Sequence, residues 1–173
     1  MRHYITSVCL LAIATSSALA DTPARPKTLG VESSAFTANG AIPSEYTCAG
    51  SEATPPLRWS NVPREARSIA IVVEDLDAPR GTFTHWIVTG IAATTTSLAG
   101  GALPAGAIAG RNDAGKSGWS GPCPPSGRHR YVFRVYALDI PLAKQLAKAD
   151  FAAAIAGHVV AQGELVGTYQ KQK

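Results

Sequence analysis

The sequence predicts a mainly β fold: an antiparallel β-sandwich or a similar β arrangement, with one or two short helices near the C-terminus. Three observations lead to this prediction. Several short runs alternate apolar and polar residues with the period of two that is typical of strands. One unbroken apolar run, residues 68–73, suits a central strand that is buried on both faces. Segments rich in glycine and proline separate these runs and leave little room for long helices.

Four strands are expected in the N-terminal half of the chain. They cover residues 29–36, 57–60, 68–73 and 84–91. In the last of them, period-two alternation places His85, Ile87 and Thr89 on one face. A long loop, residues 37–56, follows the first strand and carries Cys48. Loops of this length inside a small domain are usually functional or held in place by a cross-link.

The C-terminal half is expected to contain a hairpin, a strand, a short helix and a final strand. The hairpin lies within residues 92–117, which are rich in Ala, Gly and Thr. The helix covers residues 150–156, with Asp150 as its N-cap and Gly157 as its stop signal. The final strand covers residues 158–170.

The strand in this half, residues 128–139, divides its side chains clearly between two faces. Alternation places His129, Tyr131 and Phe133 on one face and arginines on the other. Directly before it, residues 118–127 contain three glycines and three prolines, which exclude a helix and permit tight turns. Such a loop presents backbone N–H groups, and the first inward residues of the strand that follows are a histidine and a tyrosine.

The start of the chain has the pattern of a signal peptide. A basic start at Arg2 is followed by a short apolar stretch and by Ala18-Leu-Ala20, a small-x-small cleavage site. We therefore expect residues 1–20 to be a leader and residues 21–173 to form a single domain of a periplasmic or secreted protein. The alternative is a buried N-terminal helix. The apolar stretch is too short to span a membrane, and we expect no integral membrane segment in the mature chain.

The charge of the chain argues against a nucleic-acid partner. The formal net charge is +4, and it falls to +3 when Arg2 is removed with the leader. The basic residues are spread along the chain without a lysine or arginine run.

Two cysteines, Cys48 and Cys123, remain after the leader is removed. Disulfides form and persist in the oxidising compartments outside the cytoplasm, so one bridge between these two residues is expected. The alternative is a pair of free, buried thiols.

Polar side chains stand at the ends of three predicted strands. They are Asp75 and Asp77 after one strand, His85 at the start of the next, and His129 with Tyr131 at the start of a third. If these strands are neighbours, the side chains converge on one end of a sheet. Backbone N–H groups near Gly121 could then hold an anion, a histidine could donate to it, and a carboxylate could accept from an ammonium group. Tyr131 and the prolines would supply apolar walls.

This pattern predicts a small anionic or zwitterionic ligand that binds more tightly as the pH falls through about 6 to 7, the range in which histidine protonates. Two other chemistries fit less well. A zinc site needs only two histidines and a carboxylate, but no His-x-His, His-x-x-x-His or Cys-x-x-Cys spacing is present. A serine nucleophile at Ser120 or Ser126 would lie near histidine, but the Gly-x-Ser-x-Gly elbow is absent. We expect neither a metal nor a cofactor.

Three segments together resemble the signature blocks of the phosphatidylethanolamine-binding proteins. They are residues 75–79 (Asp-Leu-Asp-Ala-Pro), residues 84–86 (Thr-His-Trp) and residues 118–131 (Gly-Trp-Ser-Gly-Pro-Cys-Pro-Pro-Ser-Gly-Arg-His-Arg-Tyr). The branch they resemble most is that of the bacterial Raf-kinase-inhibitor-like proteins. Further similarity at residues 46–50 and 163–167 extends the resemblance over about the whole mature chain.

The resemblance implies a β-sandwich of two antiparallel sheets with a small anion-binding pocket, without a metal or an established catalytic activity. The positions that match the pocket of the family are Asp75, His85, Gly121, Pro122, His129 and Tyr131. Two departures stand out: Leu76 replaces the usual proline, and Trp119 replaces a frequent tyrosine and is expected to narrow the pocket mouth.

The expected function is therefore an exported protein that binds a phospholipid head group or another small anion. The alternative is an inhibitor or modulator of an exported hydrolase or protease, with the same pocket receiving a protein partner. A third hypothesis is a weak hydrolase that uses His85 or His129.

Overall fold

The computed structural model of the protein describes residues 26–171, which form two β-sheets and one α-helix. The larger sheet has six strands in the order β1-β9-β8-β4-β5-β7, and the smaller sheet has three in the order β2-β3-β6. Neighbouring strands are antiparallel, apart from the parallel pair β1 and β9. The strands are β1 (Lys27–Thr28), β2 (Gly30–Glu32), β3 (Leu57–Ser60), β4 (Ser68–Asp75), β5 (Phe83–Ala92), β6 (Ser97–Leu98), β7 (Ile108–Ala109), β8 (Arg128–Leu138) and β9 (Val159–Gln170). The predicted mainly β fold with two sheets is confirmed.

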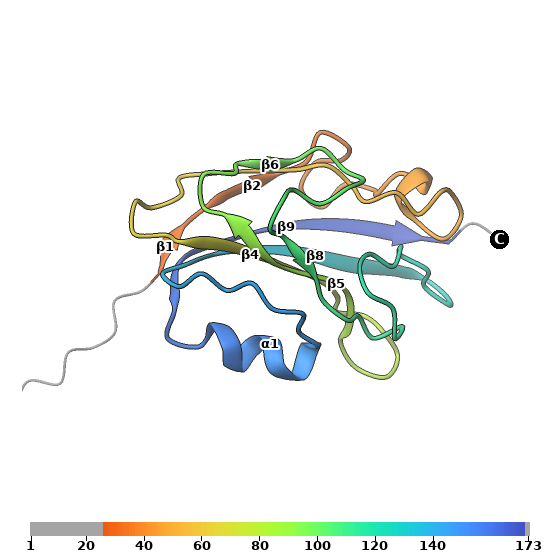
Figure 1. Ribbon diagram of the computed structural model, residues 1–173. Coiled ribbons are helices and arrows are strands. Elements are labelled where there is room, and N and C mark those ends of the chain that lie inside the picture. The colour runs from red at the N-terminus through yellow and green to blue at the C-terminus, as the bar shows by residue number, and fades with distance from the viewer. Residues whose placement is uncertain (1–25, 172–173) are drawn as a thin grey trace, which may run out of the picture.

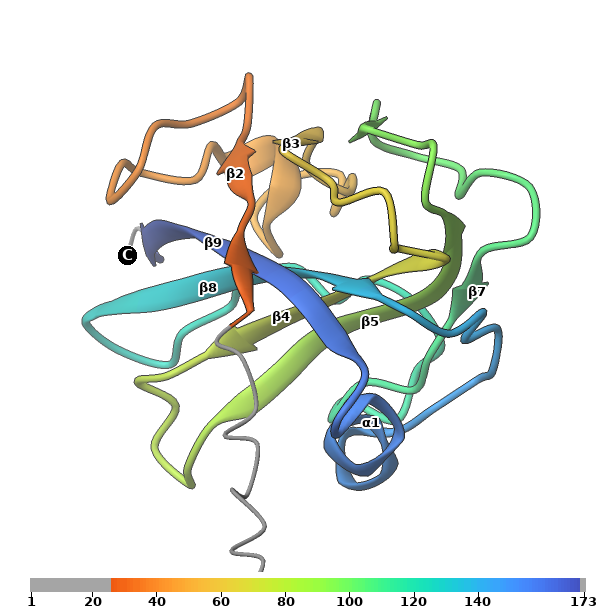
Figure 2. The same ribbon diagram turned by 90° about the vertical axis from the view of Figure 1, so that its left-hand side faces the viewer.

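The larger sheet is covered on both faces. The smaller sheet lies over one face, and helix α1 (Lys148–Ile155) lies against the other (Figures 1 and 2). On β4, Ile71 and Val73 belong to the core between the sheets, whereas Ala70 and Val72 pack in the cluster beneath the helix. This arrangement explains the unbroken apolar run of β4, because each face of a strand covered on both sides must be apolar.

Strand β8 has the predicted division of its faces. Tyr131 and Phe133 are fully buried in the core between the sheets. Arg134 lies on the opposite face, where it forms ion pairs with Glu74 at 2.6 Å and Glu164 at 3.4 Å.

The first predicted strand is too long. Only Gly30–Glu32 forms β2, after which the chain bends at Ser34 and Ala35. The Ser33 hydroxyl donates to the carbonyl oxygen of Pro56 at 2.6 Å and accepts from the N–H of Ala35 at 3.1 Å. This local hydrogen bonding competes with strand pairing, as is common for serine.

The predicted hairpin within residues 92–117 is also wrong. Strand β6 pairs with β3 in the smaller sheet, and β7 pairs with β5 in the larger sheet. The segment therefore connects the two sheets, and its two strands do not pair with each other.

Helix α1 begins two residues earlier than predicted, and Asp150 is not its N-cap. The N-cap is Ala147, which makes no side-chain capping hydrogen bond, and Asp150 lies in the first turn. The Lys148 ammonium group donates to the carbonyl oxygen of Thr82 and lies 3.7 Å from the Asp113 carboxylate, so tertiary contacts hold the start of the helix. No helix within residues 26–171 has the length and apolar character needed to cross a membrane.

Candidate functional site

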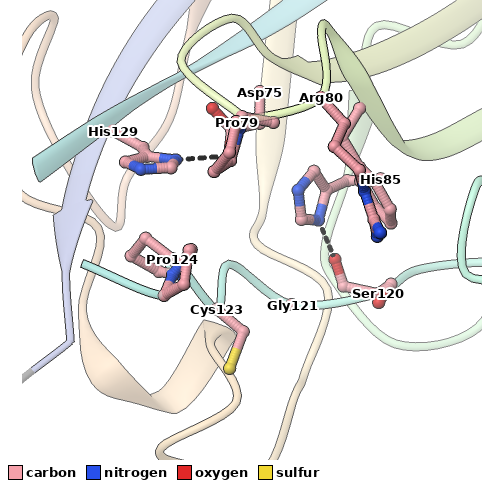
Figure 3. Close-up of a pocket in the computed structure, with 12 residues that line it drawn as sticks. Asp75, Pro79, Arg80, His85, Ser120, Gly121, Cys123, Pro124 and His129 are labelled. Carbon is pink, nitrogen blue, oxygen red and sulfur yellow. Dashed lines mark hydrogen bonds and ion pairs between the residues drawn. The ribbon is translucent and has the colours of Figure 1, made fainter. Parts of the chain in front are cut away.

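A cavity lies at the end of the larger sheet where β4 ends and where β5 and β8 begin (Figure 3). Its volume is about 490 Å³, within the range of small-molecule pockets. It is lined by Asp75, Ala78, Pro79, Arg80, Phe83, His85, Ser120, Gly121, Cys123, Pro124, Pro125 and His129. The structure therefore brings together four of the predicted site residues, namely Asp75, His85, Gly121 and His129.

Asp75 and His129 form a buried pair at this end of the sheet. Asp75 lies opposite Tyr131 in the register of β4 and β8, and His129 shares a face of β8 with Tyr131. The His129 Nδ1 atom is 2.7 Å from Asp75 Oδ2, and the two residues are 6% and 4% exposed. Asp75 Oδ1 accepts a second hydrogen bond, from the N–H of Asp77 at 2.9 Å, which closes the turn that follows β4.

His85 reaches the cavity through a β-bulge. Val73 lies opposite Trp86 and Glu74 lies opposite Thr84, so His85 is the extra residue on β5. A bulge interrupts the alternation of side chains and redirects the extra residue. Ile87 packs beneath the helix, but the His85 ring lies edge-on to Tyr131 of the sandwich core, with 5.2 Å between ring centroids. The prediction that His85 shares a face with Ile87 is therefore wrong.

The His85 ring is held by the loop that follows Gly118. Its Nδ1 atom lies 2.6 Å from the carbonyl oxygen of Ser120, and the N–H of Ser120 donates to the carbonyl oxygen of His85 at 3.1 Å. Burial lowers the pKa of His85, although the hydrogen bond to Ser120 and the negative charge of Asp75 act in the opposite direction.

Gly121 is required by the close approach of two loops. A Cβ atom at this position would lie 2.9 Å from the Cα atom of Thr47, closer than real contacts permit. The N–H of Cys48 donates to the carbonyl oxygen of Pro122 at 3.2 Å, and the predicted disulfide between Cys48 and Cys123 is present, with 5.4 Å between the Cα atoms. The loop that borders the cavity is therefore fixed to the long loop at residues 37–56.

Tyr131 and Trp119 lie behind the cavity wall and do not line the cavity. The Tyr131 hydroxyl is buried, without a hydrogen-bond partner among the described residues. Burial, and then the charge of Asp75, raises the pKa of Tyr131. Trp119 stacks on Phe133 and contacts Trp86 edge-on, so the expected narrowing of the pocket mouth by Trp119 is wrong.

Asp77 and Pro122 also lie outside the cavity lining. Strand β4 ends at Asp75, so its alternation does not extend to Asp77. The Asp77 carboxylate instead forms two hydrogen bonds with the Arg130 guanidinium, at 2.6 and 2.9 Å, and accepts the N–H of Arg130 at 2.8 Å. The guanidinium and this N–H lower the pKa of Asp77 to about 2. Pro122 is buried and supports the loop through its carbonyl oxygen.

Sequence reasoning missed Arg80 and Phe83 as cavity residues. Arg80 is exposed, and no ion pair found among residues 26–171 includes it. It follows the Ala-Pro turn after β4 and carries no periodic signal that could have marked it. Pro124 lines the cavity, and the prolines were predicted to supply its apolar walls.

The arrangement combines donors and acceptors around one small space. Arg80 supplies a cation, and the Gly121 N–H group donates to no acceptor within the described part of the chain. Asp75 and the two histidines line the same cavity, and Phe83 with the prolines adds apolar surface. Within residues 26–171 no cluster of three His, Cys, Asp or Glu side chains is suited to holding a metal ion.

Comparison with known proteins gives one consistent match. A profile of the family described as "Phosphatidylethanolamine-binding protein" matches residues 32–170. The "UPF0098 protein" of Methanothermobacter thermautotrophicus is 43% identical over 150 residues, which cover 83% of this chain and 99% of the relative.

Two solved structures are similar to the chain over most of its length. A homolog of phosphatidylethanolamine-binding protein from Chlamydia trachomatis has a TM-score of 0.79 at 40% identity, covering 84% of this chain and 99% of its own. Escherichia coli YbcL, described as a member of the mammalian family, has a TM-score of 0.77 at 33% identity, covering 83% and 99%.

Proposed function

The chain belongs to the phosphatidylethanolamine-binding protein family, and we propose that its cavity binds a small phosphorylated or otherwise anionic head group. The ligand would lie between His85 and the loop at Gly121, with His129 and Asp75 on the far side.

One observation carries this proposal: two buried histidines, the Arg80 cation and the loop at Gly121 line one cavity of suitable size. An anion next to Asp75 needs compensating positive charge. Arg80 supplies it at the cavity mouth, and protonation of a histidine adds to it. Because burial lowers the pKa of His85, protonation of this residue adds positive charge only at a lower pH than for an ordinary histidine.

Calorimetry tests the proposal directly. Inorganic phosphate and then phosphoethanolamine are titrated into the wild type and into His85→Ala. Loss of one hydrogen bond to an ionised partner should cost roughly 1.5–3 kcal/mol, or about 10- to 150-fold in Kd. His158→Ala is the matched control, because the His158 side chain is 43% exposed and pairs with Asp139 away from the cavity.

Equal affinity in the wild type and His85→Ala would place the anion elsewhere. If the wild type binds neither ligand, the proposal fails, and an inhibitor that uses the same cavity for a protein partner becomes the better hypothesis.

We also propose that the protein is exported to the periplasm or beyond. The leader pattern of residues 1–20, which lie outside the described residues, and the disulfide between Cys48 and Cys123 support this. The intact mass of protein recovered from its own cells tests it. Cleavage after Ala20 gives a chain that begins at Asp21, whereas a retained leader would contradict export through this signal.

A further inference from the structure

The hydrogen bond of His85 determines which of its ring nitrogens carries hydrogen. Nδ1 lies 2.6 Å from the carbonyl oxygen of Ser120, and a carbonyl oxygen can only accept, so Nδ1 must donate. The other ring nitrogen, Nε2, points into the cavity (Figure 3). It forms no hydrogen bond with any residue that the structure describes.

Whether Nε2 carries hydrogen depends on whether the His85 ring is protonated. Burial lowers the pKa of His85, so the ring is neutral at neutral pH. The charged and titratable groups around it are Asp75 on β4, His129 and Tyr131 on β8, and Arg80, Asp113 and Glu52 in the loops. A neutral imidazole with hydrogen on Nδ1 has a lone pair on Nε2 and acts there as an acceptor.

The opposite side of the cavity also presents acceptors. The Asp75 carboxylate accepts from His129 Nδ1 and from the N–H of Asp77, and its oxygens retain further lone pairs. The donors are the Gly121 N–H group and the Arg80 guanidinium. A ligand that uses the hydrogen-bonding groups of this site must accept hydrogen bonds from the donors and must also donate one to His85 Nε2.

We infer that the cavity selects anions that retain one acidic hydrogen, such as phosphomonoesters with a P–OH group, over anions of the same size that have none. This inference rests on the proposed anion binding at the same site. The P–OH group donates to His85 Nε2 while the remaining oxygens accept from Gly121 and Arg80. A sulfate monoester or a phosphodiester, as in an intact phospholipid, turns only lone pairs toward Nε2.

Methyl phosphate and methyl sulfate form the sharpest pair of probes. They have nearly the same size and shape, but only methyl phosphate has a second proton, which it loses near pH 6. Calorimetric titrations between pH 5 and pH 8 should show methyl phosphate binding at least about tenfold more tightly than methyl sulfate at about pH 6, where much of it keeps the P–OH hydrogen. The preference should fall toward pH 8, as methyl phosphate loses that hydrogen.

A second measurement shows directly which ring nitrogen of His85 carries hydrogen. The 15N chemical shifts of the ligand-free protein at pH 7 should show hydrogen on Nδ1 of His85 and none on Nε2. The variant His85→Gln carries a permanent amide donor and should bind methyl sulfate and methyl phosphate with similar affinity at pH 6. His158→Gln, the matched control, should keep the preference of the wild type.

The possible outcomes distinguish this inference from the proposal of anion binding on which it rests. If methyl sulfate binds the wild type as tightly as methyl phosphate at pH 6, or if Nε2 carries the hydrogen, the inference is overturned and anion binding stands. If neither probe binds at any pH between 5 and 8, anion binding itself is overturned.

Discussion

Asp75 and Asp77 are two positions apart in the sequence but serve different parts of the structure. Asp75 is 4% exposed and faces the cavity, whereas Asp77 pairs with Arg130 on the outer side of β8. Period-two alternation would place both on one face, but β4 ends at Asp75. The backbone turn separates the two carboxylates, and the hydrogen bond from the Asp77 N–H to Asp75 maintains that turn.

We predict that Asp77→Asn destabilises the protein by up to about 1 kcal/mol at pH 6 to 7, the upper range for an accessible ion pair. Arg130 holds the pKa of Asp77 at about 2, below the value of about 3.9 for an unfolded aspartate. Because the folded-state pKa is the lower one, this stabilisation is complete above about pH 4 and is lost as the pH falls toward 2.

Urea unfolding of the wild type and the variant at pH 6 and at pH 3 measures this difference. Glu32→Gln is a suitable control, since its carboxylate is 73% exposed and 3.9 Å from Arg58. A destabilisation by Asp77→Asn that is the same at both pH values would show that the ion pair is not its cause.

At the scale of secondary structure, the success of sequence reasoning depended on strand length. Strands β3, β4, β8 and β9 were found, and the burial of β4 and the faces of β8 were predicted, because each has enough residues for a pattern to appear. Strands β6 and β7 have two residues each, and no periodicity can be read in two residues. Their pairing is set by the strands they contact.

The candidate site was predictable where strands are regular and was not where they are irregular. Asp75 and His129 were expected at one end of a sheet and form a hydrogen-bonded pair there. His85 was expected near them but on the wrong face, because the bulge opposite Val73 and Glu74 leaves no mark in the sequence pattern. Arg80 was missed because it lies in a turn, where side-chain direction depends on the fold around it.

At the scale of the whole molecule, the disulfide joins two loops that are distant in the sequence. Cys48 and Cys123 are 75 residues apart, and Cys123 lines the cavity. Together with the contact of Gly121 on Thr47, the bridge fixes the loop that supplies the proposed backbone donor.

We predict that replacing both cysteines by serine lowers the free energy of unfolding by about 4 kcal/mol. In the chain-entropy model, a disulfide that closes a loop of this length destabilises the unfolded chain by about that amount, because it restricts the conformations of that chain. Urea unfolding of the variant, with reduced wild type as a control, measures the loss. Affinity for phosphate should fall as well, since the loop is no longer fixed at Gly121. Unchanged stability in both samples would mean that the bridge contributes nothing to the fold.

The parallel pairing of β1 with β9 has a consequence for how the protein is made. Lys27 lies opposite Ala161 and Thr28 opposite Gln162, so an early segment of the chain has no partner until a late one is available. Contacts between distant segments make folding slow, and this edge of the sheet cannot close while synthesis is incomplete. Under the proposed export through a channel that passes unfolded chains, the β1–β9 pair can form only after the last strand has reached the far side.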